Sequence, residues 1–409
     1  MRPDDVAVTG LGLLCPAGTT AEGIWETLSA GRSLAQRDPE LLGLPVDISC
    51  RVSGFDPVTE CGPRLARRLD RFIHLALIAA RRAVADAELD PRTWRAERVG
   101  VILGVGSNSL ETYITEFTRL GQGHPQRVSP QAMPRSLPNM AAGEVAIDLG
   151  ARGPNFCVSS ACASGATALG VARDLLLAGR CDVVLAGGSE SGRSRMTTAC
   201  FSQMRALSRR TDQPASACRP FDTDRDGFVL GEGAAVLVLE RHDYARRRGA
   251  PVRGLLSGFA ATADAYHPVA PHPEGAGSEL ALRAALADAG CAPRDVGHIN
   301  AHATSTQAGD AAEALTLLRV HDGSPPPVTA PKSVLGHSLG ASSAIEAALT
   351  VLTLERQCIP PTANLQRQDK GLELDVVAGT TRMATLDVAV STSFGFGGQN
   401  AVLVFTSPE

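Results

Sequence analysis

Short apolar runs alternate along the chain with longer segments of helical periodicity. Runs without polar alternation are typical of strands buried on both faces, and they predict strands at 6–9, 99–104, 156–159, 181–186, 234–239, 252–260, 298–301, 388–392 and 401–405. Small and apolar residues at intervals of three and four predict helices at 21–30, 64–89, 166–178, 242–248, 278–289, 311–320 and 339–354. Residues 32–62 are predicted as loops, and 111–140 as an irregular, partly helical segment broken by prolines.

The alternation of strands and helices favours an α/β fold with a parallel sheet that is covered on both faces. With 409 residues, the chain is longer than one ordinary hydrophobic core supports. The order of the elements predicts two successive β/α halves of unequal length. No linker or low-complexity segment separates them, so we expect the halves to pack as one unit.

Composition narrows the class of protein. Apolar residues make up 44% of the chain and charged residues 20%, and the net charge of −4 disfavours nucleic-acid binding. Residues 1–5 are acidic and lack signal-peptide features, and no uncharged apolar run approaches the roughly 18 residues of a membrane span. The ten cysteines form no CxxC pair, which favours reduced thiols over disulfides or a zinc site. A cytoplasmic protein without a metal ion is therefore predicted.

One cysteine lies where a short strand is predicted to turn into a helix. Cys162 is surrounded by residues too small to cover it, in the sequence Ser159-Ser160-Ala161-Cys162-Ala163-Ser164-Gly165. The N–H groups and partial positive charge of a helix N-terminus favour a thiolate, so we expect the pKa of Cys162 to be lowered. Gly165 would let a substrate carbonyl approach the backbone. A buried, unreactive core thiol is the alternative for a lone cysteine.

Three later clusters of polar residues follow predicted strands, which is the usual place for active-site groups in parallel α/β sheets. They are 300–310 (NAHATSTQAGD), 332–340 (KSVLGHSLG) and 393–400 (SFGFGGQN). The second contains a GHSLG sequence that matches the nucleophile elbow of α/β-hydrolases and would make Ser338 a nucleophile. In those enzymes a histidine follows the serine, but none of the nine histidines follows Ser338. An acyl hydrolase is therefore the less favoured alternative.

Together, the clusters resemble those of the β-ketoacyl-ACP synthases, most closely the elongating type II enzymes of fatty-acid and polyketide synthesis. The resemblance covers nearly the whole chain, from Val8-Thr9-Gly10-Leu11-Gly12 through Ala161-Cys162-Ala163 to Gly395-Phe396-Gly397-Gly398. It implies the thiolase fold, with two similar βαβαβαββ halves in five α-β-α-β-α layers. The implied halves are residues 1–250, with the nucleophilic cysteine, and residues 251–409, with the catalytic histidines.

The resemblance also implies the roles of three residues. Cys162 matches the nucleophile that takes the acyl chain as a thioester. His302 and His337 match the histidines that bind the malonyl thioester and promote its decarboxylation. Two imidazole N–H donors at the thioester carbonyl would stabilise the enolate that remains when CO2 leaves. The carbanion would then attack the Cys162 thioester in a Claisen condensation and give a 3-ketoacyl product on acyl carrier protein.

Other residues match supporting positions of the family. Lys332 matches a catalytic lysine that is expected to hydrogen-bond to Glu346. The backbone N–H groups of Cys162 and Phe396 match an oxyanion hole, and the ring of Phe396 matches the gate of the acyl pocket. The remaining matches are Thr304, Thr306, Ser107 and Phe394 for substrate binding, Asp310 for structural support, and Arg64, Arg67, Arg68 and Arg205 for docking of acidic acyl carrier protein. A solvated basic face is the alternative for these arginines. No cofactor is implied beyond the phosphopantetheine of the carrier protein.

Several positions depart from the family pattern. Ala303 replaces the usual glycine after the first histidine, Ser342-Ser343 replaces Ala-Gly, and Ser107-Asn108-Ser109 replaces a glycine-rich stretch near the acyl pocket. Glu144 stands where a basic or neutral polar residue is common. These changes predict a specialised synthase, with secondary metabolism as the expected setting. A homodimer is expected, and the alternative is a ketosynthase subunit that pairs with a chain-length-factor-like partner.

Overall fold

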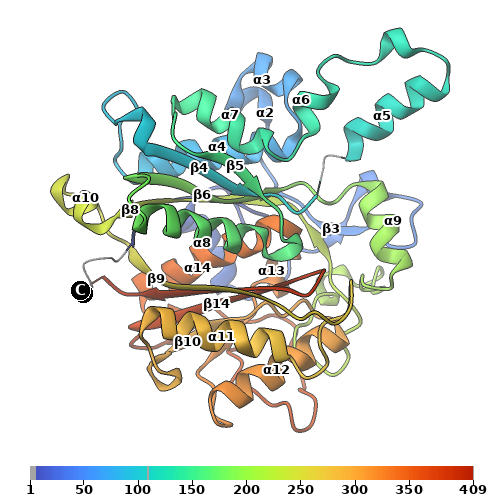
Figure 1. Ribbon diagram of the computed structural model, residues 1–409. Coiled ribbons are helices and arrows are strands. Elements are labelled where there is room, and N and C mark those ends of the chain that lie inside the picture. The colour runs from blue at the N-terminus through green and yellow to red at the C-terminus, as the bar shows by residue number, and fades with distance from the viewer. Residues whose placement is uncertain (1–5, 108–109, 409) are drawn as a thin grey trace.

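Ten strands form the central sheet of the computed structural model, which describes residues 6–107 and 110–408 (Figure 1). The strands of the first half are β1 (Val6–Leu14), β4 (Val99–Gly104), β5 (Asn155–Val158), β6 (Val183–Glu190) and β8 (Gly233–Arg241). Those of the second half are β9 (Gly254–Ala263), β10 (His298–Asn300), β11 (Val328–Thr329), β14 (Val388–Gly395) and β15 (Gln399–Thr406).

The two groups of strands have the same topology. The order is β5-β4-β6-β8-β1 in the first group and β11-β10-β14-β15-β9 in the second. In the first, β4 pairs in parallel with β5 and β6, and β8 pairs antiparallel with β6 and β1. In the second, β10 pairs in parallel with β11 and β14, and β15 pairs antiparallel with β14 and β9. The groups meet where residues 6–8 of β1 pair with residues 254–256 of β9.

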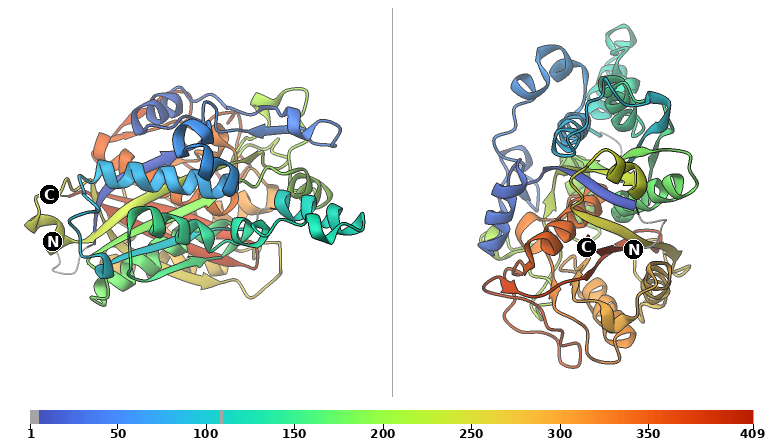
Figure 2. Two further views of the ribbon diagram at one scale, coloured as in Figure 1. Left: turned by 90° about the horizontal axis from the view of Figure 1, so that it is seen from above. Right: turned by 90° about the vertical axis from the view of Figure 1, so that its left-hand side faces the viewer.

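Helices form three layers around the two half-sheets (Figures 1 and 2). The outer face of the first half-sheet packs against α4 (Arg71–Asp86) and α7 (Met140–Leu149). The outer face of the second packs against α11 (Ala276–Ala289) and α12 (Gln307–Val320). Between the half-sheets lie α8 (Ser164–Leu177) and α14 (Ser342–Arg356), whose buried side chains join both halves in one core. The layers therefore have the expected α-β-α-β-α order.

Helix α4 lies unusually close to β1. A Cβ atom on Gly10 would lie 2.2 Å from the carbonyl oxygen of Ala83, and one on Gly12 would lie 1.9 Å from that of Ala79. Only glycine in the strand and a small residue in the helix permit this approach. The series of alanines in the sequence predicted such close packing over the second half of this helix.

The single helix predicted at 64–89 is wrong, because the chain forms α3 (Pro63–Arg68) and then α4. The backbone is extended at Leu69 and Asp70 between them. The Asp70 carboxylate accepts hydrogen bonds from the Thr112 hydroxyl at 2.6 Å and from Arg135 at 2.5 Å. These partners lie far along the chain, so local periodicity did not indicate the break.

Residues 32–62 contain more structure than the predicted loops. Strands β2 (Gln36–Arg37) and β3 (Ile48–Cys50) form a small sheet with β7 (Leu230–Gly231), and α2 (Pro57–Cys61) follows. The irregular segment contains α5 (Leu110–Gly121), which projects from the body of the molecule, and α6 (Ala132–Ser136) (Figures 1 and 2). The other short elements are α1 (Ala21–Ser29), α9 (Arg195–Gln203), α10 (His242–Arg247), α13 (Lys332–Leu335), β12 (Cys358–Ile359) and β13 (Arg382–Met383).

All ten cysteines lie among the described residues, and none of them forms a disulfide there. Within residues 6–107 and 110–408, none of the helices has both the length and the apolar character of a membrane span. The same part of the chain contains no cluster of His, Cys, Asp and Glu side chains suited to a metal ion.

Candidate active site

Cys162 lies in a 3-10 turn between β5 and α8. The turn is tight, because Ala161 has a φ of +50°. The Ser164 hydroxyl stabilises it by accepting a hydrogen bond from the Ser160 N–H at 3.0 Å and donating one to the Ala161 carbonyl at 2.6 Å. A Cβ atom on Gly165 would lie 2.7 Å from the backbone of α14. The nucleophile candidate is therefore held where the two central helices begin.

The environment of Cys162 corrects the expected direction of its pKa. The residue is 9% exposed, and burial raises the pKa of its thiol to about 11. The positive charge of Lys332 and the backbone N–H of Phe396 act in the opposite direction and lower that pKa. Desolvation exceeds these effects, so Cys162 is a thiol at neutral pH.

His337 points its ring at Cys162. Its backbone is fixed by β7, because its N–H donates to the Val229 carbonyl at 2.7 Å and its own carbonyl accepts the Gly231 N–H at 2.9 Å. Its Nε2 lies 3.1 Å from the Cys162 sulfur. The Phe228 ring meets the imidazole edge-on with the ring centres 5.2 Å apart. Backbone and ring packing thus fix the imidazole beside the thiol.

His302 follows β10 and faces the same space. Its backbone N–H and that of Ala303 both donate to the buried Glu313 carboxylate, at 2.9 and 2.7 Å. The His302 ring centre lies 5.6 Å from that of His337 and 5.7 Å from that of Phe394, both in edge-to-face geometry. Glu313 on α12 therefore positions the loop that carries the histidine.

A buried ion pair lies behind the histidines. Nζ of Lys332 is 2.5 Å from Oε1 of Glu346 and 3.3 Å from Nδ1 of His302. Burial raises the pKa of Glu346 to about 7, against the opposing effect of the lysine. Burial and the Lys332 charge together hold the pKa of His302 and of His337 well below the ordinary value of 6.5. Both imidazoles are therefore neutral at pH 7.

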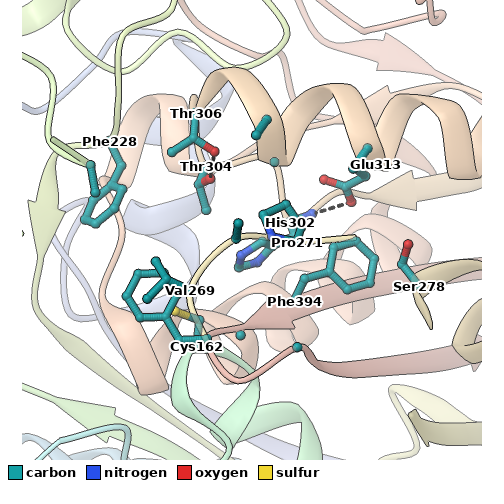
Figure 3. A pocket seen from close by; sticks show the side chains of 18 of the residues that line it. Cys162, Phe228, Val269, Pro271, Ser278, His302, Thr304, Thr306, Glu313 and Phe394 are labelled. Carbon is teal, nitrogen blue, oxygen red and sulfur yellow. Dashed lines mark hydrogen bonds between the residues drawn. The ribbon is translucent and has the colours of Figure 1, made fainter. Parts of the chain in front are cut away.

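A cavity of about 340 Å³ leads to these groups (Figure 3). Its wall includes Cys162, His302, His337, Thr304, Thr306, Phe394 and Phe396. The hydroxyls of Thr304 and Thr306 lie 3.0 Å apart on the same wall. The lining combines apolar rings with a few hydroxyls, a mixture typical of small-molecule sites.

The end of β14 closes on the nucleophile turn. A Cβ atom on Gly395 would lie 2.6 Å from the Ser160 carbonyl and 3.1 Å from the Cys162 nitrogen, so a glycine is required there. This approach brings the backbone N–H of Phe396 to the Cys162 sulfur. The Phe396 ring packs 5.9 Å from that of Phe201 at the cavity wall. The N–H groups of Cys162 and Phe396 thus flank the sulfur.

Ser107 is not part of this cavity wall. Its hydroxyl donates to the buried Glu190 carboxylate at 2.9 Å, and the backbone N–H groups of Gly106 and Ser107 donate to the same carboxylate. Burial raises the pKa of Glu190 to about 7. The neighbouring departures Asn108 and Ser109 lie outside the described residues.

Asp310 has the contacts of a structural residue. It is 1% exposed and accepts hydrogen bonds from the backbone N–H groups of Phe221 at 2.8 Å and Ser305 at 3.0 Å. Burial raises its pKa to about 7. Ser305 has a φ of +68°, so the bond to Asp310 holds a strained residue of the His302 loop.

The arginines expected to dock a carrier protein differ in their surroundings. Arg68 forms a two-pronged ion pair with Glu144, which is 4% exposed, so its guanidinium is already paired within this chain. Arg64 and Arg67 are exposed on α3 and do not line the cavity. Arg205 is exposed and does line it. The structure therefore brings only Arg205 to the cavity of this chain.

Ser338 has none of the geometry of a hydrolase nucleophile. It is 2% exposed, and its Oγ packs so closely against Gly231 that a Cβ atom on that glycine would lie only 2.9 Å away. The neighbouring His337 turns its Nε2 to Cys162 instead. The GHSLG sequence therefore presents its histidine, and not its serine, to the cavity.

Two family models match the chain over most of its length. Residues 3–245 match the N-terminal domain of β-ketoacyl synthases, and residues 253–366 match their C-terminal domain. This chain belongs to the β-ketoacyl synthase family. Membership identifies it as a condensing enzyme of the acyltransferase type, as the sequence predicted.

Similar proteins agree with this assignment. The chain is 41% identical over 410 residues to 3-oxoacyl-[acyl-carrier-protein] synthase 2 of Synechocystis sp., with 98% of this chain and 97% of the relative covered. It is 39% identical over 406 residues to the Vibrio cholerae enzyme of the same name, with 98% of each covered.

Solved structures confirm the thiolase fold of this β-ketoacyl synthase. The ishigamide ketosynthase/chain length factor superposes with a TM-score of 0.93 at 32% identity, with 99% of each chain covered. A second similar structure is a complex of a type II PKS acyl-carrier protein with its ketosynthase bound to the hexaketide. It superposes with a TM-score of 0.92 at 30% identity, with 100% of each chain covered.

Two buried carboxylates of this β-ketoacyl synthase were missed at the sequence level. Glu190 ends β6 and binds the loop after β4, while Glu313 binds the loop after β10. Glu313 lies three residues after Asp310, in the first turn of the helix predicted at 311–320, and this position was an available signal. Glu190 had no local signal, because its partners are 83 and 84 residues away.

Proposed function

We propose that this chain catalyses the decarboxylative condensation of an acyl thioester with malonyl-ACP to give 3-ketoacyl-ACP. The observation that carries the proposal is the placement of one thiol and two neutral imidazoles at one cavity: Nε2 of His337 is 3.1 Å from the Cys162 sulfur, and the two imidazole centres are 5.6 Å apart. In our proposal Cys162, His302, His337 and Lys332 are the catalytic residues.

The first step is acyl transfer. The Cys162 sulfur forms a bond to the acyl carbon, the bond from that carbon to the pantetheine sulfur breaks, and the Cys162 proton passes to the departing pantetheine thiolate. The N–H groups of Cys162 and Phe396 are placed to donate to the oxyanion, because both flank the sulfur. Phe396 also lies at the cavity wall as the gate to the acyl chain.

The second step uses the histidines. Malonyl-ACP loses CO2, and the electron pair of the broken C–C bond passes into an enolate whose oxygen accepts N–H bonds from His302 and His337. The carbanion attacks the Cys162 thioester, a C–C bond forms, the C–S bond breaks, and Cys162 takes a proton from water. Thr304 and Thr306 are placed along the cavity to bind the amides of phosphopantetheine. No other cofactor is part of the proposal.

The substrate carrier in this proposal is acyl carrier protein. Two relatives have 3-oxoacyl-[acyl-carrier-protein] synthase names, and one similar structure contains an acyl-carrier protein. Secondary metabolism is the favoured setting, because two of the similar structures are a type II PKS ketosynthase and the ishigamide ketosynthase/chain length factor. We propose that residues 1–250 form the half that carries the nucleophile and residues 251–409 the half that carries the histidines. The proposed location of the protein is the cytoplasm.

Replacement of the nucleophile tests the proposal. Cys162→Gln should abolish formation of a covalent acyl-enzyme and of 3-ketoacyl-ACP, while decarboxylation of malonyl-ACP continues. Mass spectrometry of the protein and of the carrier-bound products measures both. The matched control is Cys157→Ala, which removes a thiol five residues earlier and should leave condensation unchanged. Condensation that persists in Cys162→Gln would contradict the proposal.

A homodimer is the assembly we propose. Strand β5 is the free edge of the first half-sheet, and exposed apolar side chains lie on it and on α7, which packs against it: Phe156 on β5 and Ile147 on α7 are 39% and 72% exposed. Open edges and apolar patches of this kind mark interfaces. Ile147→Arg should shift the mass measured by light scattering toward the monomer, while Leu280→Arg, on α11, should not.

A heterodimer is the second candidate, because one of the similar structures is a ketosynthase/chain length factor. Its test is the chain expressed alone. A lone homodimer that forms 3-ketoacyl-ACP excludes an obligatory second subunit. A lone chain that decarboxylates malonyl-ACP but needs an added partner to elongate would establish it.

A further inference from the structure

The first residue of α14 makes contact with the imidazole of His337. Oγ of Ser342 lies 3.0 Å from Nδ1 of His337, on the side of the ring opposite Cys162, and accepts a hydrogen bond from the Ser338 N–H at 2.8 Å. A 3-10 turn, closed by the bond from the Ala341 N–H to the Ser338 carbonyl at 3.0 Å, returns the chain to the histidine. The contact between Ser342 and His337 is shielded from solvent, since Ser342 is 4% exposed.

The protons at this contact can be assigned from the available partners. A serine hydroxyl has one proton to donate and two lone pairs that accept. The Ser338 N–H occupies one lone pair, so among the hydrogen bonds of residues 6–107 and 110–408 the only acceptor for the Ser342 proton is Nδ1 of His337. If Nδ1 carried the proton instead, the buried hydroxyl proton would have no acceptor, which is unfavourable.

The other histidine has the same arrangement with a different donor. Nδ1 of His302 faces the ammonium group of Lys332 at 3.3 Å, and an ammonium group can only donate. Both imidazoles therefore meet a donor at Nδ1. A neutral imidazole that accepts at Nδ1 carries its proton on Nε2.

We propose that Ser342 is a positioning residue that holds His337 as the tautomer with its proton on Nε2. This N–H points at the Cys162 sulfur, and it donates to the thioester carbonyl once malonyl-ACP is bound. The proposal rests on the function proposed above. It makes His337 a hydrogen-bond donor rather than the base that removes the Cys162 proton. The residue is also one of the departures from the Ala-Gly pattern of the family, so this support comes from a side chain peculiar to the sequence of this chain.

Ser343 supplies a matched control. It is the adjacent serine, it is equally buried, and its hydroxyl accepts the Ala166 N–H at 3.0 Å. It links α14 to α8 but makes no hydrogen bond to either histidine among the described contacts. Ser343→Ala thus removes one buried hydrogen bond without changing the contacts of His337.

The test compares full-length wild type, Ser342→Ala, Ser342→Thr and Ser343→Ala, each labelled with 15N-histidine. The His337 signals are assigned by their loss in His337→Asn. We expect a protonated Nε2 and an unprotonated Nδ1 in wild type and in Ser343→Ala, and a mixture of tautomers in Ser342→Ala. Malonyl-ACP decarboxylation should fall on the order of tenfold or more in Ser342→Ala, mainly in kcat, and recover in Ser342→Thr.

Two results would overturn the proposal: a protonated Nδ1 of His337 in the wild type, or a Ser342→Ala variant that matches Ser343→Ala in both spectrum and kcat. The spectra need no substrate. A wild type that shows the Nε2–H tautomer but never decarboxylates malonyl-ACP would therefore contradict the proposed function and leave the assignment of Ser342 as a tautomer-fixing residue intact.

Discussion

Lys332 and Glu346 form a salt bridge of 2.5 Å with the lysine 1% and the glutamate 2% exposed. The sequence contains only one other lysine, Lys370, and otherwise uses arginine for its cations. An ammonium group is a compact charge that can donate to an imidazole nitrogen without the planar geometry that arginine requires. The same charge lowers the pKa of Cys162 and those of both histidines.

Removal of this charge should make Cys162 less reactive. In Lys332→Met the pKa of the thiol rises, because the cation that favours the thiolate is lost, and the pKa values of His302 and His337 rise for the same reason. At a fixed pH below the thiol pKa, the rate of iodoacetamide labelling should fall about tenfold for each pH unit by which the pKa of Cys162 rises. Lys370→Met, at an exposed position, should leave the rate unchanged.

Loss of one partner of a buried ion pair also costs about 3–5 kcal/mol of stability. The double variant Lys332→Met/Glu346→Gln separates the two effects, since it leaves no unpaired charge. It should recover much of the stability in urea while its labelling stays slow. Wild-type labelling rates in the folded double variant would contradict an electrostatic role of Lys332.

Glu190 gives a prediction for stability against pH. Its folded-state pKa of about 7 exceeds the ordinary 4.5, so the folded protein holds a proton that the unfolded chain releases between these values. This contribution is present below pH 4.5 and is lost as the pH rises to about 7. Glu190→Gln removes the dependence. From pH 4.5 to 8 the wild type should therefore lose on the order of 2–3 kcal/mol relative to Glu190→Gln.

Urea unfolding at several pH values measures this difference, and Glu26→Gln, at an exposed position of α1, is the control. The other titratable groups that interact with Glu190 are the thiols of Cys157 and Cys162, both with pKa values of about 11, so neither titrates in the window. A wild type that gains stability over Glu190→Gln between pH 4.5 and 7 would show that the carboxylate, not the acid, is the favoured form.

Local patterns were sufficient for much of the central scaffold. The apolar run at 99–104 coincides with β4, the order of elements predicted two β/α halves, and the alanines predicted close packing over the second half of α4. The clusters at 300–310 and 332–340 indicated the histidines, because loops at the carboxyl ends of parallel strands meet at one edge of a sheet.

Properties that depend on distant partners were not predictable in this way. The pKa of Cys162 was expected to fall because of the helix N-terminus, but burial in the assembled core outweighs that effect. Arg68 was grouped with the exposed arginines, although Glu144, 76 residues away, binds it. Burial and pairing of this kind are determined only by the tertiary fold.

Arg205 should contribute to carrier-protein binding more than Arg68. It is exposed at the cavity, where the acidic carrier would deliver its arm. Arg205→Ala should raise KM for malonyl-ACP severalfold with little change in kcat. High salt should raise the KM of the wild type toward that of the variant, because it screens the charge of Arg205. Arg95→Ala is the control, because Arg95 precedes β4 at the opposite end of the sheet.

Arg68→Ala should instead lower stability, because it leaves the buried Glu144 without its partner. Its melting temperature should fall, while KM of the fraction that remains folded stays close to that of the wild type. Equal KM effects of Arg68→Ala and Arg205→Ala would indicate that the α3 arginine also contacts the carrier.

Ala303 tests how the His302 loop tolerates its departure from glycine. Its φ of +29° is unfavourable for a residue with a Cβ atom, yet its methyl group is buried at 1% exposure in the core of the second half. In Ala303→Gly the relief of backbone strain and the loss of the buried methyl group oppose each other, so stability should change by less than about 1 kcal/mol. Ala303→Val should lose more than about 2 kcal/mol, because a β-branched residue fits this φ poorly and its added methyl groups crowd the cavity wall. Urea unfolding of both variants measures this asymmetry. A valine variant as stable as the glycine variant would show that the loop, despite its two bonds to Glu313, can move away.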